Sequence, residues 1–145
     1  MANDDTINLL KECNAGVKMA IKSFDEVIER VKSLKMREQL EESRKKHEEI
    51  EKKTEIRLHE YGSEDKEPNK MATAMAWMKI NFKYATEPTD SEIASLMIDG
   101  CNMGIQSVSR YFNKYSAADE EVKKMVDDIV KLEQKLMDEL RFYLN

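Results

Sequence analysis

The sequence predicts an all-α protein that folds as one four-helix bundle over residues 1–145. Charged residues make up 37% of the chain and hydrophobic residues 41%, a balance typical of long amphipathic helices. Only 4 glycines and 2 prolines are present, too few for the many turns of a sheet. Apolar residues recur every seven positions, as they do along the buried seam of a helix bundle. This length suits a single domain with a real core.

The first helix is expected from about Asp4 to Lys32, with Asn3 as a capping candidate. Four of its apolar residues are spaced by seven and should face the core: Leu10, Val17, Phe24 and Val31. A short turn around Ser33 follows. Its brevity requires the next helix to run back antiparallel to the first.

The second helix is expected from about Leu34 to Tyr61, because Gly62 is a typical residue just after a helix end. Its seam is more polar than that of the first helix: Met36, Leu40, Ser43, His47, Ile50, Thr54, Leu58 and Tyr61. The histidine at the centre of this seam, His47, is the first candidate site residue.

The third helix is expected from Thr89 to about Tyr115, because Thr89 and Glu92 have the spacing of a capping box. Gly100 and Gly104 lie inside this helix. A glycine in a helix costs about 1 kcal/mol relative to alanine, and the usual return is the close approach of another helix. We therefore expect a neighbouring helix to pack closely against both glycines.

The fourth helix is expected from about Asp119 to the C-terminus. Its apolar stripe contains Val122, Val126, Ile129, Leu136, Leu140 and Tyr143. One charged residue, Glu133, interrupts this stripe and is the second candidate site residue.

A short extra helix is expected over Met71–Tyr84, between Pro68 and Pro88, in the long crossover that joins the second and third helices. Its apolar residues lie on two stripes, one of which should pack on the bundle. The second stripe contains Trp77, Ile80 and Tyr84 and is a candidate interface. The competing interpretation is that both stripes pack on the chain's own bundle.

Two wirings of the bundle are compatible with this order. If the crossover traverses the bundle, its helix covers about 20 Å at ~1.5 Å per residue, and the third helix runs parallel to the second. If the crossover stays at one end, the helices alternate in direction. We favour the traverse, because a long excursion with its own apolar helix is more than an end cap requires.

The chain resembles the uncharacterised bacterial ferritin-like four-helix-bundle proteins that are grouped as a domain of unknown function. The resemblance rests on four stretches: LLKECNAGVKMAIKSF at 9–24, LHEYG at 58–62, AWMKINFKY at 76–84 and CNMGIQSVSRYF at 101–112. It implies the ferritin-like wiring with one long crossover, and a cytosolic bacterial protein.

A ferritin-like di-iron site needs a glutamate from each of two helices and a Glu-x-x-His motif from each of the other two. In the traversing wiring, His47 and Glu133 fall at the same height, with Val17 and Lys18 on the first helix and Met103 and Gly104 on the third. Arg44 stands three residues before His47, and Leu136 stands three residues after Glu133, so neither motif is intact. We therefore expect no metal and no cofactor.

His47 and Glu133 can be interpreted in two ways. They are either a residual ligand pair of a degenerate metal site or a core histidine hydrogen-bonded to a buried carboxylate, because buried polar groups must be paired. We favour the second interpretation. Cys13 and Cys101 fit no metal spacing and are expected to be reduced, buried thiols.

The composition also limits the function. The formal net charge of −5, with both signs interspersed, argues against nucleic-acid binding. No uncharged apolar run is long enough to span a membrane and the N-terminus lacks a signal-peptide layout, so we expect a cytoplasmic protein. No nucleophile motif or phosphate-binding glycine loop is present, so we expect that the chain is not an enzyme.

Three functions remain. The favoured one is a non-catalytic binding or scaffold module that self-associates as a homo-oligomer, a dimer. The second is an iron-handling oxidase or store, which only the family resemblance supports. The third is a protein that coats a membrane or granule surface through the Met-rich helix, with Lys70, Lys79 and Lys83 nearby.

Overall fold

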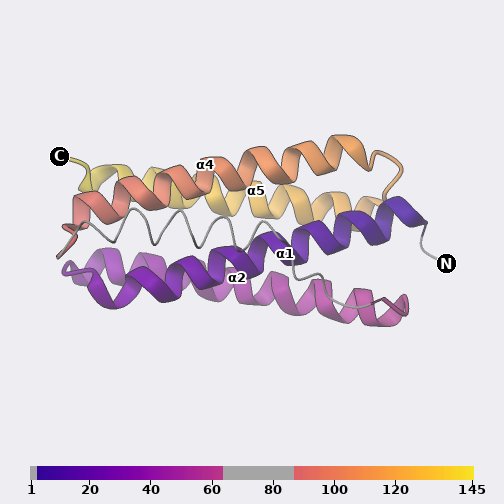
Figure 1. The fold of residues 1–145 in the computed structure, drawn as a ribbon, viewed down its shortest axis with the longest axis horizontal. Helices are drawn as coiled ribbons and strands as arrows, with labels where there is room; N and C mark the ends of the chain where they lie inside the picture. The colour runs from indigo at the N-terminus through magenta and orange to yellow at the C-terminus, as the bar shows by residue number, and fades with distance from the viewer. Residues whose placement is uncertain (1–2, 64–86) are drawn as a thin grey trace.

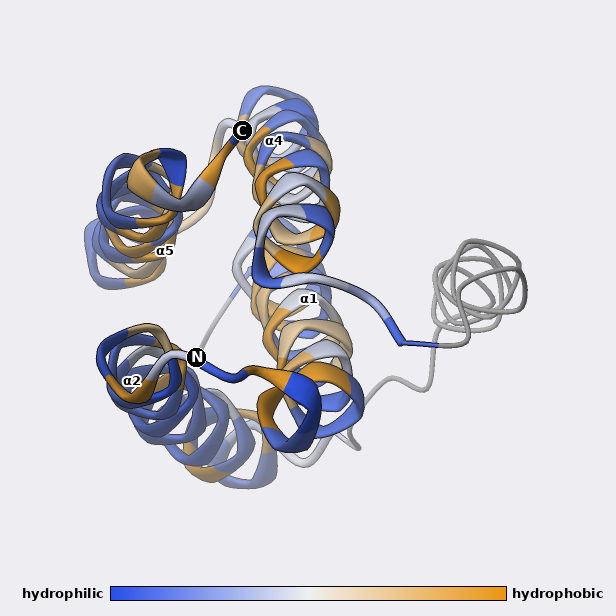
Figure 2. Ribbon diagram, turned by 90° about the vertical axis from the view of Figure 1, so that its left-hand side faces the viewer, coloured by the Kyte–Doolittle hydropathy of each residue, from blue (hydrophilic) through white to orange (hydrophobic). Residues whose placement is uncertain are grey.

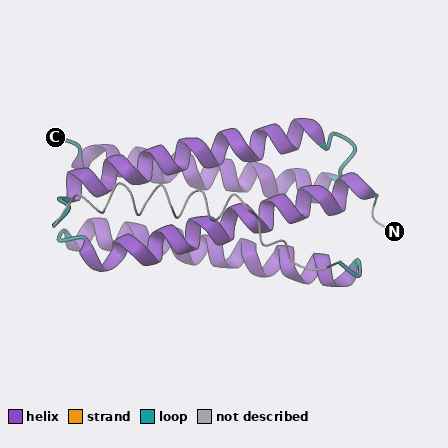
Figure 3. Cartoon of the chain, in the orientation of Figure 1, coloured by secondary structure: helices purple, strands orange, loops and turns teal. Residues whose placement is uncertain are grey.

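The computed structural model describes residues 3–63 and 87–145. Those ranges contain no strand, which confirms the all-α prediction (Figure 3). They hold four long helices: α1 (Asp4–Val27), α2 (Leu34–Glu60), α4 (Asp90–Lys114) and α5 (Glu120–Leu140). Two 3₁₀ turns, η1 (Ile28–Arg30) and η2 (Arg141–Tyr143), follow α1 and α5. None of these helices combines the length and the apolar character that crossing a membrane demands.

The helices lie side by side along one axis and form a bundle (Figure 1). α1 packs mainly on α2 and α4 mainly on α5, so the bundle consists of two antiparallel hairpins. The hairpins meet where α1 packs on α4 and α2 packs on α5. Figure 2 looks along the bundle and shows the four helices around a common centre.

Hydrogen bonds at both ends fix the relative direction of the helices. Asp90, at the start of α4, accepts from the backbone N–H groups of Lys32 and Ser33 at 2.8 and 2.9 Å, just before α2 begins. α2 and α4 therefore start at the same end and run parallel, as the traversing crossover predicts. The C-terminal end of α2 and the N-terminal end of α4 therefore lie at opposite ends of the bundle (Figure 1). The predicted helix Met71–Tyr84 lies outside the described residues.

Most helix ends follow local signals in the sequence. The side chain of Asn3 accepts from Thr6 N at 2.8 Å and caps α1. Thr89 and Glu92 form the predicted capping box of α4. Gly62, just after α2, has a φ of 69°, a left-handed conformation that glycine adopts without strain.

The end of α1 was predicted wrongly. α1 stops at Val27 rather than Lys32, because Ile28–Arg30 form a 3₁₀ turn and Val31 is extended. A 3₁₀ turn rises ~2.0 Å per residue instead of ~1.5 Å, and an extended residue rises more. The connection is therefore longer than a helix of the same residues, which shifts α2 along α1 relative to the predicted register.

The core consists of two apolar clusters, one toward each end of the bundle. The cluster at the end with the C-terminus includes Phe24, Val27, Met36, Leu40, Ile93, Met97, Cys101, Leu136 and Leu140. The cluster at the other end includes Leu9, Leu10, Cys13, Val17, Leu58, Val108, Val122, Val126 and Ile129. His47 lies between the two clusters on α2, and Glu133 lies between them on α5.

Candidate functional site

His47 and Glu133 are in direct contact in the middle of the bundle. α2 supplies the imidazole and α5 the carboxylate, and His47 Nε2 lies 2.5 Å from Glu133 Oε1. Both side chains are buried, His47 with only 1% of its surface exposed. The second ring nitrogen, His47 Nδ1, lies 2.7 Å from the backbone oxygen of Ser43, one turn earlier on the same helix. Both nitrogens of the imidazole are therefore occupied.

These contacts fix where the protons lie. A backbone carbonyl only accepts hydrogen bonds, so Nδ1 of His47 carries a proton and donates it to Ser43 O. The contact between Nε2 and Oε1 is a hydrogen bond, with one hydrogen between the ring nitrogen and the carboxyl oxygen. In either form of this bond, the two side chains together carry no net charge. A buried pair of zero net charge avoids the large desolvation cost of an isolated buried ion.

α4 contributes two neighbours of Glu133. The Cys101 thiol donates a hydrogen bond to the carboxylate, and its pKa is raised by burial and, to a lesser extent, by the negative charge of Glu133. Gly104 lies one turn further along α4, where an added Cβ would be 3.7 Å from Glu133 Oε2. The prediction that a helix approaches Gly104 closely is therefore not confirmed, because the neighbour there is the Glu133 side chain at ordinary van der Waals distance. The prediction is not confirmed for Gly100 either, because no residue of the described ranges lies within 4 Å of an added Cβ there.

α1 contributes Phe24, whose ring meets the His47 ring edge-on with centroids 5.2 Å apart. The sequence had placed Val17 and Lys18 at this height on α1. The shifted register of the α1–α2 hairpin brings Phe24 there instead. Sequence reasoning also missed Cys101, although it lies one helical turn before Gly104, which had been placed at the level of Glu133.

Within residues 3–63 and 87–145, no group of three or more His, Cys, Asp or Glu side chains is arranged to hold a metal ion. The two positions that would complete Glu-x-x-His motifs have other roles. Arg44 lies at the bundle surface and forms ion pairs with Asp25, at 2.7 Å, and with Glu48. Leu136 is part of the apolar core.

A second buried polar pair joins α1 to α2 nearer the N-terminal end. Asn14 Nδ2 donates to Thr54 Oγ1 at 3.0 Å, and Thr54 Oγ1 donates to the backbone oxygen of Glu51 at 2.8 Å. Asn14 Oδ1 is buried without a hydrogen-bond partner among the described residues. The adjacent Cys13 is also buried, and burial followed by the charge of Glu12 raises its pKa to about 12.

The predicted interface residues Trp77, Ile80 and Tyr84 lie outside the described residues, as do Lys70, Lys79 and Lys83. In the described part of the chain, five large apolar side chains are exposed: Leu34, Ile56, Met103, Phe142 and Leu144. Three of these, Leu34, Phe142 and Leu144, come from the end of the bundle where α2 begins and α5 finishes (Figure 1). Sequence reasoning did not single out these three residues.

No curated protein and no solved structure matches the chain. A family model does match it over residues 5–114, from the start of α1 to the end of α4. His47, Cys101 and Gly104 lie inside the matched segment, whereas Glu133 lies outside it. The match covers most of the sequence, and the chain therefore belongs to the family described as Domain of unknown function (DUF2383).

Proposed function

We propose that this chain is a non-catalytic, ferritin-like bundle protein of the bacterial cytosol that self-associates and serves as a binding or scaffold module. In this proposal His47 and Glu133 are the remnant of a metal site and now stabilise the core. The observation that supports it most is the direct contact between His47 Nε2 and Glu133 Oε1 at 2.5 Å. Each of the two potential metal ligands already satisfies the other.

The burial of the reactive groups also supports a non-catalytic role. A general base or nucleophile must reach its substrate, but His47, Glu133 and Cys101 are all buried in the core. The raised pKa of Cys101 keeps it a thiol, and the thiolate is the nucleophilic form. Both cysteines are free, which fits a reducing compartment.

The exposed side chains Leu34, Phe142 and Leu144 support self-association, because large apolar groups gathered at one end of a helical bundle are typical of contact surfaces. The stripe Trp77, Ile80 and Tyr84 stays a predicted interface of the same kind. A homodimer is the simplest assembly that covers such a surface, because a two-fold axis uses the same patch twice.

The test combines mass determination with metal analysis. Protein expressed in iron- and zinc-rich medium is measured by light scattering during size exclusion and by elemental analysis after dialysis. We expect a concentration-dependent dimer with substoichiometric metal, and we expect the double variant His47→Leu/Glu133→Leu to form the same dimer. Two iron ions per chain, retained by the wild type and lost by the double variant, would overturn the proposal.

The second candidate is a protein that binds one divalent metal ion. One observation favours it: the hydrogen bond from His47 Nδ1 to Ser43 O is the kind that orients a metal-binding histidine. His47, Cys101 and Glu133 are not arranged to hold a metal ion in the described structure, so a bound ion would have to rearrange them. Nitrogen, sulfur and oxygen donors together suit zinc. Zinc titration by calorimetry decides between the two candidates, with Cys101→Ala as the matched variant. Stoichiometric binding that this variant weakens would establish the second candidate.

A further inference from the structure

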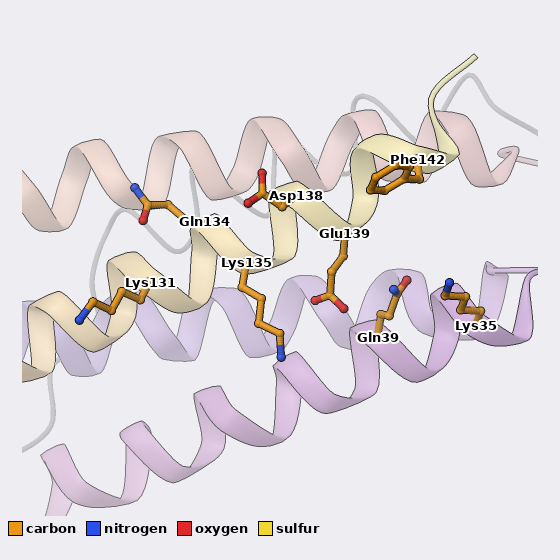
Figure 4. Close-up of a pocket in the computed structure, with 8 residues that line it drawn as sticks. All are labelled: Lys35, Gln39, Lys131, Gln134, Lys135, Asp138, Glu139 and Phe142. Atoms are coloured by element: carbon orange, nitrogen blue, oxygen red, sulfur yellow. The ribbon is translucent and has the colours of Figure 1, made fainter.

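An open groove of about 520 Å³ lies between α2 and α5, beside the C-terminal turn. It is lined by Lys35, Gln39, Lys131, Gln134, Lys135, Asp138, Glu139 and Phe142. Figure 4 shows Lys135 and Glu139 extending from α5 toward α2, with Phe142 at the end of the groove. The groove shares no lining residue with the buried pair His47 and Glu133.

The charges along α5 reverse sign at the centre of this groove. Lys131 and Lys135 come first, Asp138 and Glu139 follow, and Phe142 ends the series. Lys131 is paired with Asp127 on its own helix at 2.8 Å. Lys135, Asp138 and Glu139 form no ion pair or hydrogen bond with another residue of the described chain. These three charges are therefore available to a partner.

We propose that a second copy of this chain docks on this face, with its α5 antiparallel to the first. A two-fold axis that crosses α5 at right angles between Lys135 and Asp138 places Lys135 opposite Asp138 of the partner subunit, twice in the dimer. The same operation brings Lys131 of one copy toward Phe142 of the other, where a cation–π contact can form. This inference rests on the proposed self-association and names the surface that carries it.

The order of the charges is the reason to choose a second copy over another ligand. A uniformly acidic partner would be repelled by Asp138 and Glu139, and a uniformly basic partner would be repelled by Lys131 and Lys135. The matching surface must carry the same charges in reverse order, and a two-fold axis supplies that reversal from the chain itself.

The size of the surface determines how strongly the two copies are expected to associate. A standard interface buries about 800 Å² on each partner, and smaller interfaces belong to weak or transient complexes. The α5 face from Lys131 to Phe142 spans about 17 Å at ~1.5 Å per residue, so it forms only part of a standard interface. We therefore expect an equilibrium that depends on concentration rather than a permanent dimer. Phe142, with 78% of its surface exposed, is the apolar anchor of the contact.

The experiment is sedimentation velocity of the full chain over a wide concentration range, with two charge variants. Lys135→Glu places two carboxylates opposite each other, and Asp138→Lys places two ammonium groups opposite each other. Each variant alone should weaken the dimer by about tenfold or more.

An equimolar mixture of the two variants should restore association by forming a heterodimer. In that heterodimer the carboxylate introduced by Lys135→Glu on one chain faces the ammonium group introduced by Asp138→Lys on the other. The second contact pairs the two native side chains, Asp138 of the first chain and Lys135 of the second. Both contacts then join opposite charges, as they do in the proposed wild-type dimer.

Lys124→Glu is the matched control. Lys124 is an exposed lysine on the same helix, and the proposed axis carries it beyond the end of the partner chain. The control should dimerise as the wild type does. All substituted side chains are exposed, so circular dichroism should show unchanged melting.

The outcomes separate this inference from the proposed function. A wild type that dimerises while both charge variants dimerise equally well overturns the α5 surface and leaves self-association standing. Variants that dissociate but fail to form a heterodimer when mixed also overturn the proposed pairing. A wild type that stays monomeric at every concentration overturns both proposals.

Discussion

The bundle contains two buried polar pairs, and they are built differently. His47 and Glu133 are ionisable, come from different hairpins and lie 2.5 Å apart, from Nε2 to Oε1. Asn14 and Thr54 are neutral, belong to one hairpin and lie 3.0 Å apart. In the first pair every nitrogen of the imidazole has a partner, whereas in the second Asn14 Oδ1 has none among the described residues.

The two pairs therefore have different roles in the bundle: one joins the two hairpins, and the other lies within a single hairpin. The His47–Glu133 pair ties the two hairpins together at a fixed height, because neither group has another strong partner in the core if the hairpins slide. The Asn14–Thr54 pair lies within one hairpin, whose register the short α1–α2 connection already sets. We therefore expect large effects at the first pair and small ones at the second.

Glu133→Ala is the most damaging single change that the comparison predicts. It leaves His47 Nε2 buried without its partner and opens a cavity, so the free energy of unfolding should fall by about 3–5 kcal/mol. Urea denaturation measures this loss, with the exposed Glu41→Ala as a control that should change stability by less than about 0.5 kcal/mol. A loss below about 1 kcal/mol for Glu133→Ala would show that the pair does not hold the hairpins together.

Replacing both partners should avoid the loss of stability that is expected for Glu133→Ala. In His47→Leu/Glu133→Leu no polar group is left unpaired, and such replacements are often neutral or stabilising by about 1–4 kcal/mol. Measured in the same urea series, the double variant should unfold at a higher urea concentration than Glu133→Ala. If it is as unstable as the single variant, the pair itself, rather than the orphaned histidine, carries the stability.

The thiol beside the neutral pair predicts a pH effect. The folded state raises the pKa of Cys13 from 9.0 to about 12, so above pH 9 the unfolded state binds fewer protons than the folded state. Stability from this thiol is complete below pH 9 and is lost as pH rises toward 12, at about 1.4 kcal/mol per pH unit. Unfolding free energies between about pH 8 and 10.5 should therefore fall less steeply in Cys13→Ala than in the wild type. Equal slopes would contradict the burial of this thiol.

Asn14→Leu should have a smaller effect. It removes the hydrogen bond to Thr54 but also removes the unpaired Oδ1, and Thr54 keeps its bond to the Glu51 carbonyl. The two contributions oppose each other, so the unfolding free energy should change by no more than about 1.5 kcal/mol. A loss as large as that expected for Glu133→Ala would remove the distinction between the two pairs.

The two glycines of α4 give the smallest expected difference in stability. No described residue lies within 4 Å of a Cβ added at Gly100, so Gly100→Ala should gain the full helix propensity of alanine, about 0.8–1.0 kcal/mol. At Gly104 the new methyl group would lie 3.7 Å from Glu133 Oε2, an oxygen to which it cannot donate a hydrogen bond. Thermal melting should therefore show a smaller gain for Gly104→Ala. A larger gain there would show that the carboxylate does not need this space.

The sequence predicts the helices well where a local signal marks their ends, as Asn3, Gly62 and the Thr89–Glu92 capping box do. It fails at the end of α1, because nothing in the composition of Ile28–Arg30 distinguishes a 3₁₀ turn from a continued helix. That local error placed Val17 and Lys18, rather than Phe24, at the height of His47 on the first helix.

The residues of the candidate site were also predicted only where the sequence pattern gives a signal. His47 and Glu133 could be singled out because each is a polar residue in an apolar stripe. Cys101 gave no such signal, because a buried cysteine is ordinary in a core. The groove beside Phe142 was missed as well, because it depends on how α2 and α5 meet, which one-dimensional periodicity does not contain.

The distance along the chain between the partners of the central pair has a consequence for folding kinetics. His47 and Glu133 are 86 positions apart, whereas each hairpin closes through contacts between adjacent helices. Loop closure makes local contacts form early and distant ones late. We therefore expect the hairpins to form first, and the contact between His47 and Glu133 to form only when the hairpins dock. Substitutions at this pair should then accelerate unfolding far more than they slow refolding.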